Sequence, residues 1–332
     1  MKKNFLRFLV FFDLCLSIAV FAFALSYLLK PTLLQNLKTP PQLPPIIPHP
    51  LSSLQKLPVS SSKLTLLLAG DIMLGRHVNI KMHQKNDFNY PFQKISSIFK
   101  DADLAFANLE SPFANPCPKT STGMRFCADK KSLDGLKSSG LKVFNLANNH
   151  ILNYGQKNLE YTIKLLSEND LSPLYCHENY GTPLCPLRLE IKNQSIAFLG
   201  YDLTIYPKLE EKILDDIKKT KPQVDLLFVS LHWGVEYQPK PTPAQVNLAH
   251  QIIDAGADLI IGHHPHVIQP PETYQDKLIL YSLGNLVFDQ SWSEETKTGL
   301  ITQITFEDKK ITQTKFQKIY IKDQYQPEII SQ

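Results

Sequence analysis

Residues 257–266 read ADLIIGHHPH, a short apolar run followed directly by three histidines. An apolar run of this length is typical of a strand buried on both faces of a parallel sheet. The chain contains ten histidines in all, and three of them fall within four positions. They could bind a metal, transfer protons or lie together by chance. The stretch predicts a buried strand that presents polar side chains at its carboxyl end.

The same order of an apolar run and then polar residues recurs along the chain. Further examples are KLTLLLAGD, LAFANLE, KVFNLANNH, VDLLFVSLHWG and KLILYSLGN, which begin at residues 63, 104, 142, 224 and 277. Amphipathic stretches at 156–168 and 243–255 predict helices between them, the second opened by Thr242 and Pro243. Short apolar strands that alternate with helices predict an α/β domain with much buried sheet. Two antiparallel additions are expected, a hairpin about Lys192 and Asn193 and a tail after residue 298.

Side chains that bind metals follow these predicted strands within a few residues. Because the carboxyl ends of parallel strands share one edge of a sheet, we expect the side chains to meet there. Carboxylate, imidazole and amide oxygen together suit zinc, manganese or iron. Each residue alone has an ordinary explanation as a turn, a helix cap or a packed ring, and only their shared placement favours a metal site. The candidates are Asp71, Glu110, Asn149, His150, His232, His264 and His266.

The spacing within the histidine group gives a geometric expectation. In an extended segment His264 and His266 project to one side and His263 to the other. We therefore expect His264 and His266 to be ligands. His263 is expected to lie behind the ligands or on the surface.

The N-terminal 62 residues differ from the rest in charge and hydropathy. They carry a net charge of +5, which leaves −1 for the remainder, so no broad basic face is available for a nucleic-acid partner.

A basic flank at residues 1–7 precedes an apolar run at 8–29, which as a helix is ~33 Å long and spans a bilayer. The flank predicts a cytoplasmic N-terminus, a single-pass anchor in the cell membrane and an extracytoplasmic main domain at 63–332. A signal peptide cleaved after AFA at 22–24 is the alternative. Residues 30–62 are predicted to form a proline-rich linker.

Four cysteines lie in the predicted external domain, in CPKTSTGMRFC and CHENYGTPLC. An even number in an exported domain favours disulfides, and local pairing of Cys117 with Cys127 and of Cys176 with Cys185 is the simplest of three connectivities. A zinc knot is the alternative, but the cysteines are too widely spaced for CxxC pairs.

Six motifs between about residues 64 and 290 give the sequence a family resemblance: GDIMLGR, NLESP, NNHILNYG, LHWGVEY, GHHPHVIQ and SLGNLVFDQ. In this order they resemble the CapA family of poly-γ-glutamate capsule synthesis proteins. That family is similar to calcineurin-type metallophosphatases. The resemblance implies an α/β fold of two sheets in an α/β/β/α sandwich, with a two-metal centre at the strand ends.

The resemblance also implies a role for each candidate. Asp71 would bind the first metal ion, Glu110 would bridge the two ions and Asn149 would bind the second. His150 would handle protons. His232, His264 and His266 would complete the shell. Apart from the resemblance, a hydrolase could use Arg76 and the backbone near Gly75 to hold an anionic group.

Two positions depart from the family pattern. Met73 stands where metallophosphatases usually carry the histidine of an Asp-x-His pair, which leaves one metal short of a ligand. Asn153 stands where the CapA pattern commonly has the aspartate that orients the proton-handling histidine.

Two classes of function follow. The first is an exported metal-dependent hydrolase acting on a phosphoester or amide bond, which need not concern a capsule. The second is an accessory role in the synthesis, export or anchoring of an acidic capsule polymer such as poly-γ-glutamate, together with capsule-synthesis membrane proteins. A zinc amidohydrolase barrel is disfavoured, because there the H-x-H pair closes the first strand and here GD does.

The charge pattern of the N-terminus predicts a topology that protease treatment can test. Protease added to intact protoplasts should remove residues 63–332, because the basic flank holds the N-terminus in the cytoplasm. Immunoblotting against the main domain measures this removal. Full protection would refute the orientation, and mature protein beginning near Leu25 in the medium would show cleavage instead.

Overall fold

A computed structural model describes residues 63–177, 184–322 and 325–330. The predicted basic flank, anchor and linker at residues 1–62 lie outside this part of the chain, so their existence stays a prediction. Within the described residues no helix has the length and apolar character needed to cross a membrane.

The first sheet joins parallel strands to an antiparallel tail. Its order is β16-β15-β14-β1-β2-β3-β4, and β13 pairs with the end of β1. Strands β1 to β4 are parallel, whereas β14 runs antiparallel to β1 and continues into β15 and β16. The bounds are β1 Leu64–Ile72, β2 Leu104–Leu109, β3 Val143–Asn145, β4 Ser172–Leu174, β13 Asn285–Val287, β14 Thr298–Glu307, β15 Lys310–Lys322 and β16 Gln326–Ile329. The predicted antiparallel tail is confirmed.

The second sheet has the order β10-β11-β8-β7-β6-β5, with β6, β7, β8 and β11 parallel. Lys192 and Asn193 both have positive φ and join β5 to β6, so the predicted hairpin is confirmed. A short antiparallel pair joins β9 and β12, and β12 contacts β8. The bounds are β5 Leu187–Ile191, β6 Gln194–Asp202, β7 Leu226–His232, β8 Leu259–His263, β9 Ile268–Gln269, β10 Glu272–Tyr274, β11 Lys277–Leu280 and β12 Ser282–Leu283.

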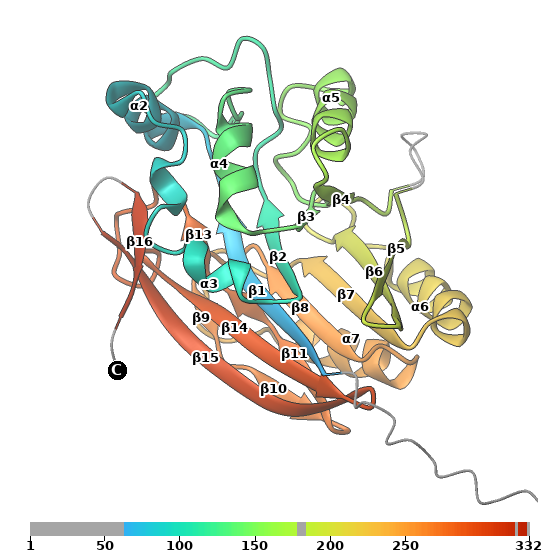
Figure 1. Cartoon of the computed structure of the whole chain (residues 1–332). Helices are drawn as coiled ribbons and strands as arrows, with labels where there is room; N and C mark the ends of the chain where they lie inside the picture. Colours follow the sequence, from blue (N-terminus) through green and yellow to red (C-terminus); the bar gives the residue numbers. More distant parts are fainter. Residues whose placement is uncertain (1–62, 178–183, 323–324, 331–332) are drawn as a thin grey trace, which may run out of the picture. The chain divides into compact units, whose positions relative to one another are not determined.

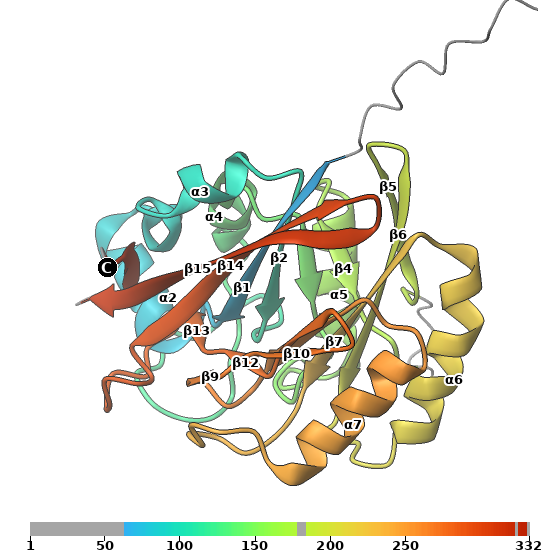
Figure 2. The ribbon, with the colours of Figure 1, turned by 90° about the horizontal axis from the view of Figure 1, so that it is seen from below.

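Helices cover the outer faces of the two sheets (Figures 1 and 2). The first sheet is covered by α2 Arg76–Lys85, α3 Ser96–Lys100, α4 Ser132–Ser139 and α5 Gln156–Ser167. The second is covered by α6 Glu210–Thr220 and α7 Pro243–Asp254. Short 3-10 turns lie at Tyr90–Phe92 and Lys221–Gln223. The predicted helices at 156–168 and 243–255 are confirmed as α5 and α7, and Thr242 forms a capping box with Gln245.

Alternating side chains of β1 explain the layers. Leu66 and Leu68 pack into the cluster between the two sheets, whereas Leu67 and Ala69 pack against the helices of the first sheet. Every residue of β7 is buried, as expected for a strand covered on both faces. The chain is therefore a mixed α/β protein with two packed sheets between helical layers.

Both predicted disulfides are present, Cys117–Cys127 and Cys176–Cys185. The first closes a loop whose residues Gly123 and Phe126 contact the side chains of Arg76 and His150. The alternative of a zinc knot is wrong.

Near the end of β1 a glycine lets the backbone between β12 and β13 approach closely. A Cβ atom on Gly70 would lie 1.9 Å from the carbonyl oxygen of Gly284, so no larger residue fits before Asp71. The Asp71 amide in turn donates to the same carbonyl at 3.0 Å. This contact fixes the end of β1, and with it the position of the Asp71 carboxylate. We call the edge formed by the ends of β1, β2, β7 and β8 and the loops after β3 and β8 the rim.

Candidate metal centre

Five of the predicted ligands are buried together at the rim. Asp71 lies near the end of β1, Glu110 follows β2, and His232 is the last residue of β7. His264 and His266 lie in the loop that follows β8. Asp71, Glu110 and His232 are 0% exposed, and His264 and His266 no more than 7%. The first sheet thus supplies the acids and the second sheet the imidazoles.

One group of potential ligands joins the two sheets through His266. Ligand atoms of Asp71, Glu110 and His266 all lie within 4.8 Å of one another. His266 Nδ1 is 3.1 Å from Asp71 Oδ2, and His266 Nε2 is 3.7 Å from Glu110 Oε1. These atoms are close enough to share one cation.

A second group surrounds His232. Its Nε2 atom lies 3.6 Å from Glu110 Oε1 and 3.0 Å from Asn149 Oδ1. The rings of His232 and His264 have centroids 4.8 Å apart. Glu110 therefore borders both groups, which is the position that a bridging carboxylate requires.

The carboxylate of Glu110 shows whether a cation fits this site. Both of its oxygens are buried, and within the described residues neither has a hydrogen-bond donor in reach. Buried polar atoms in native proteins almost always have a partner, and an ionised carboxylate buried without one is strongly destabilising. A divalent cation satisfies such an oxygen. The residues present therefore fit a metal ion.

Burial and neighbouring charges shift the pKa values of the ligand groups. Burial raises the pKa of Glu110 well above its usual value; the charge of His266 opposes this shift and that of Asp71 adds to it. Burial alone lowers the pKa of His266, but the carboxylates of Glu110 and Asp71 raise it to about 9. Burial and the nearby His264 lower the pKa of His232 well below 6.5. The raised pKa values of Glu110 and His266 favour a bound proton between these two side chains, in the region that a cation would fill.

A network of buried asparagines orients Asp71. Asn108 Nδ2 donates to Asp71 Oδ1 at 2.9 Å. Asn108 Oδ1 in turn accepts from Asn145 Nδ2 at 2.9 Å and from Asn148 Nδ2 at 3.1 Å. Sequence reasoning missed these residues. The signal was an asparagine inside each of two apolar runs, LAFANLE and KVFNLANNH, where an apolar residue is expected.

The predicted orientation of the three neighbouring histidines is wrong. β8 ends at His263, and both His264 and His266 have positive φ, 95° and 57°, so the segment turns instead of remaining extended. His263 is fully buried, and its Nδ1 lies 3.0 Å from Asp71 Oδ1. A surface position is excluded. The remaining expectation, that His263 lies behind the ligands, agrees with this contact.

His150 lies beside the rim with its ring held on two sides. Its Nδ1 lies 3.0 Å from Asn153 Oδ1, which also accepts the Phe126 N–H, so Nδ1 carries the proton of the neutral ring. The Phe126 ring centroid is 4.0 Å away. Burial lowers the pKa of His150 to about 4, although the Asn153 hydrogen bond opposes the shift. Asn153 therefore makes a hydrogen bond with His150, as the aspartate of the family pattern is expected to do, but it supplies no carboxylate.

Arg76 is the first residue of α2, and its guanidinium is engaged by the protein itself. Its Nε donates to Asp289 at 3.1 Å, Nη2 donates to the other Asp289 oxygen, and Nη1 donates to the Gly123 carbonyl at 3.1 Å. Three of the five N–H donors of an arginine are thus used. Binding of an anionic group by Arg76 stays a prediction. Asp289 was not singled out in the sequence, although it lies in the motif SLGNLVFDQ.

Met73 is fully buried in the apolar cluster between the first sheet and its helices. Its sulfur accepts the Gly75 N–H at 3.0 Å. The position at which a histidine ligand would be expected is therefore occupied by a packed thioether.

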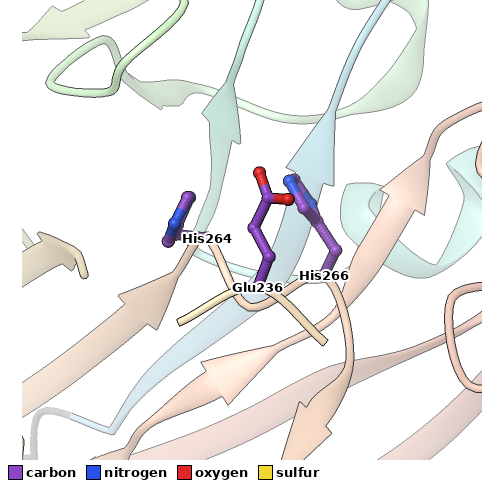
Figure 3. A group of neighbouring side chains, drawn as sticks. All are labelled: Glu236, His264 and His266. Atoms are coloured by element: carbon purple, nitrogen blue, oxygen red, sulfur yellow. The ribbon is translucent and has the colours of Figure 1, made fainter. Parts of the chain in front are cut away.

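Glu236 is an acid near the site that sequence reasoning missed. It lies in the loop after β7, and a carboxylate oxygen of Glu236 and ring nitrogens of His264 and His266 all lie within 4.8 Å of one another. Figure 3 shows the three side chains together. The motif LHWGVEY contained this acid four residues after His232.

Comparison with known proteins identifies relatives over most of the described chain. Residues 65–290 match the family model described as bacterial capsule synthesis protein PGA_cap. The capsule biosynthesis protein CapA of Bacillus anthracis is 34% identical over 262 residues, which is 73% of this chain and 64% of that protein. The PGA biosynthesis protein CapA of Bacillus subtilis is 32% identical over 262 residues, 73% of this chain and 68% of that protein. The alignment thus spans about two thirds of these relatives.

A solved structure extends the comparison to the fold. The crystal structure of a hypothetical protein from Thermus thermophilus matches with a TM-score of 0.52 at 17% sequence identity. The match covers 80% of this chain and 99% of that one. At this identity the match bears on the fold alone.

The low pKa of His150 predicts a pH dependence of stability in EDTA. Between pH 6.5 and 4 the unfolded chain binds more protons at His150 than the folded chain, so the free energy of unfolding falls as the pH is lowered through this window. His150→Gln removes this contribution, which amounts to at most about 3 kcal/mol. Urea unfolding at pH 7 and pH 4.5 measures it.

Asn153→Asp provides the matched control for this experiment. A carboxylate beside Nδ1 raises the pKa of His150 in the folded chain, so the loss of stability should end at a higher pH and be smaller in total. Identical pH dependence in the wild type and in His150→Gln would contradict the assignment.

Proposed function

Because the chain belongs to the PGA_cap family of bacterial capsule synthesis proteins, we propose that it is an accessory protein in the production of an acidic capsule polymer and carries a metal-dependent hydrolase site. The observation that carries the metal part of this proposal is the Glu110 carboxylate, buried between imidazoles with both oxygens unsatisfied among the described residues. A carboxylate in that setting is explained by a cation that it binds.

Two cations would share Glu110 in this proposal. Asp71, Glu110 and His266 would hold the first, and Glu110, Asn149, His232 and His264 the second. The oxygen and nitrogen donors suit Mn²⁺, Zn²⁺ or Fe²⁺. When bound, such ions supply Lewis acidity toward a phosphoester or amide bond and toward water.

His150 is the residue that we assign to proton transfer. At neutral pH its ring is neutral, with the proton on Nδ1 and the lone pair on Nε2. Nε2 therefore accepts a proton before it can donate one to a leaving group. Asn153 and the Phe126 ring hold the imidazole in place during this exchange.

An acidic polymer is the substrate class that best suits the family and the site. The names of two relatives, a capsule biosynthesis protein and a PGA biosynthesis protein, support this choice. A polymer of glutamate carries a carboxylate on every unit, and a centre with two divalent cations attracts such groups. Cleavage of its amide bonds would release or trim chains. A phosphoester is the alternative substrate for the same ligand set.

The proposal includes attachment to the outer surface of the cell membrane. It rests on the apolar run at 8–29 and the basic residues before it. The proline-rich residues 30–62 would then separate the rim from the membrane surface.

Substitution of His264 and of His266, one ligand of each proposed cation, tests the metal centre. His264→Ala and His266→Ala in the full-length protein should each lower the bound metal per chain sharply and leave the fold largely intact, because both residues lie in a loop at the end of β8. Elemental analysis after dialysis against Mn²⁺ or Zn²⁺ measures the content. His250→Ala is the matched control, because His250 lies on α7 and pairs with Glu272 of β10. Equal occupancy in wild type and His264→Ala would refute the centre.

His150→Ala separates the two classes of function. In a hydrolase it removes proton transfer and should lower the rate by about 10²–10⁴-fold while metal content is retained. Release of amines from poly-γ-glutamate and cleavage of a nitrophenyl phosphodiester measure the rate. Under a role in which the site binds polymer without cleaving it, His150→Ala should leave polymer production in cells near normal.

A further inference from the structure

We propose that Glu236 is a metal ligand of the rim and takes the place of the ligand that the chain lacks at Met73. This inference rests on the proposed metal centre and adds one residue to it. The Asp-x-His pattern of metallophosphatases is broken here, and no member of the expected ligand set replaces the missing histidine.

The Glu236 carboxylate is placed for this role. It extends toward the gap between the rings of His264 and His266, as Figure 3 shows, and reaches ligand atoms of both within 4.8 Å. His266 also belongs to the group formed with Asp71 and Glu110. Glu236 therefore reaches the first proposed cation through His266 and borders the second through His264.

The loop that carries Glu236 is tied to the loop that carries the histidines. The Tyr237 N–H donates to the Pro265 carbonyl at 2.8 Å, between His264 and His266. Gln269 Nε2 donates to the carbonyls of Gln238 and Lys240 at 2.9 and 3.0 Å. Tyr237 keeps a positive φ of 63°, a conformation that needs such support. The acid is thus held next to the two imidazoles by backbone contacts.

Met73 cannot fill the same role. Its sulfur faces the Gly75 amide inside an apolar cluster, and a thioether suits soft cations such as Cu⁺. Replacement of a neutral imidazole by a carboxylate adds a negative charge to the shell, and oxygen donors favour manganese. The centre should therefore bind Mn²⁺ through Glu236.

Titration of the metal-free, full-length protein with Mn²⁺ tests the role of Glu236. Glu236→Gln should weaken the affinity at least about tenfold, and it should change the visible absorption of the Co²⁺-loaded protein, which reports the ligand set. Glu236→Asp should also weaken binding, because its shorter side chain moves the carboxylate away from the two imidazoles. Glu190→Gln, on the exposed edge strand β5, is the matched control and should change neither measurement.

Three outcomes overturn the inference. Wild-type affinity and an unchanged Co²⁺ spectrum in Glu236→Gln would show that Glu236 is no ligand. Wild-type affinity in Glu236→Asp, with loss in Glu236→Gln, would show that only its charge matters. A wild-type protein that takes up no Mn²⁺ or Co²⁺ would refute the proposed metal centre itself, and so is distinguishable from the first two.

Discussion

The buried carboxylate of Glu110 is the constraint around which the rim is organised. It stands immediately after β2, faces His232 from one side and His266 from the other, and within the described structure meets no hydrogen-bond donor. Leaving such a group ionised and unpaired costs several kcal/mol of folding free energy. The fold tolerates the arrangement only if a proton or a cation is held there. The neighbouring imidazoles and the Asp71 carboxylate are the donors that the proposed cation would share with Glu110.

The two-sheet architecture creates this constraint by bringing strand ends of both sheets to the same edge. β1 and β2 carry the acids, whereas β7 and the loop after β8 carry the imidazoles. Gly70 permits the close backbone approach at the end of β1, and Asn108 then fixes the carboxylate of Asp71. The buried asparagines at this edge carry hydrogen bonds between neighbouring strands of the first sheet. The apolar strands thus hold the rim in place, and the polar residues at their ends supply its carboxylates and imidazoles.

Local sequence patterns predicted most of the strands and part of the candidate site. Apolar runs and their polar ends located the strands and brought Asp71 and Glu110 to one edge, because neighbouring parallel strands of a sheet end at the same edge. His232 comes from the other sheet, and only the family resemblance implied that two sheets meet at this edge. The turn at His264 was not predictable from spacing, since positive φ at a non-glycine residue depends on tertiary contacts. The pairing of Arg76 with Asp289 joins residues 213 positions apart, and the approach of Glu236 to His266 depends on how two loops pack. No local pattern encodes either contact.

Anomalous X-ray scattering from crystals grown with Mn²⁺ would locate the proposed cations without reference to activity. Two peaks about 3.5–4 Å apart are expected. Both should lie within bonding distance of the Glu110 carboxylate, the first beside Asp71 and His266 and the second beside Asn149, His232 and His264. An empty rim at saturating Mn²⁺, with the Glu110 oxygens bonded to water or to a protonated neighbour, would contradict the proposed metal centre.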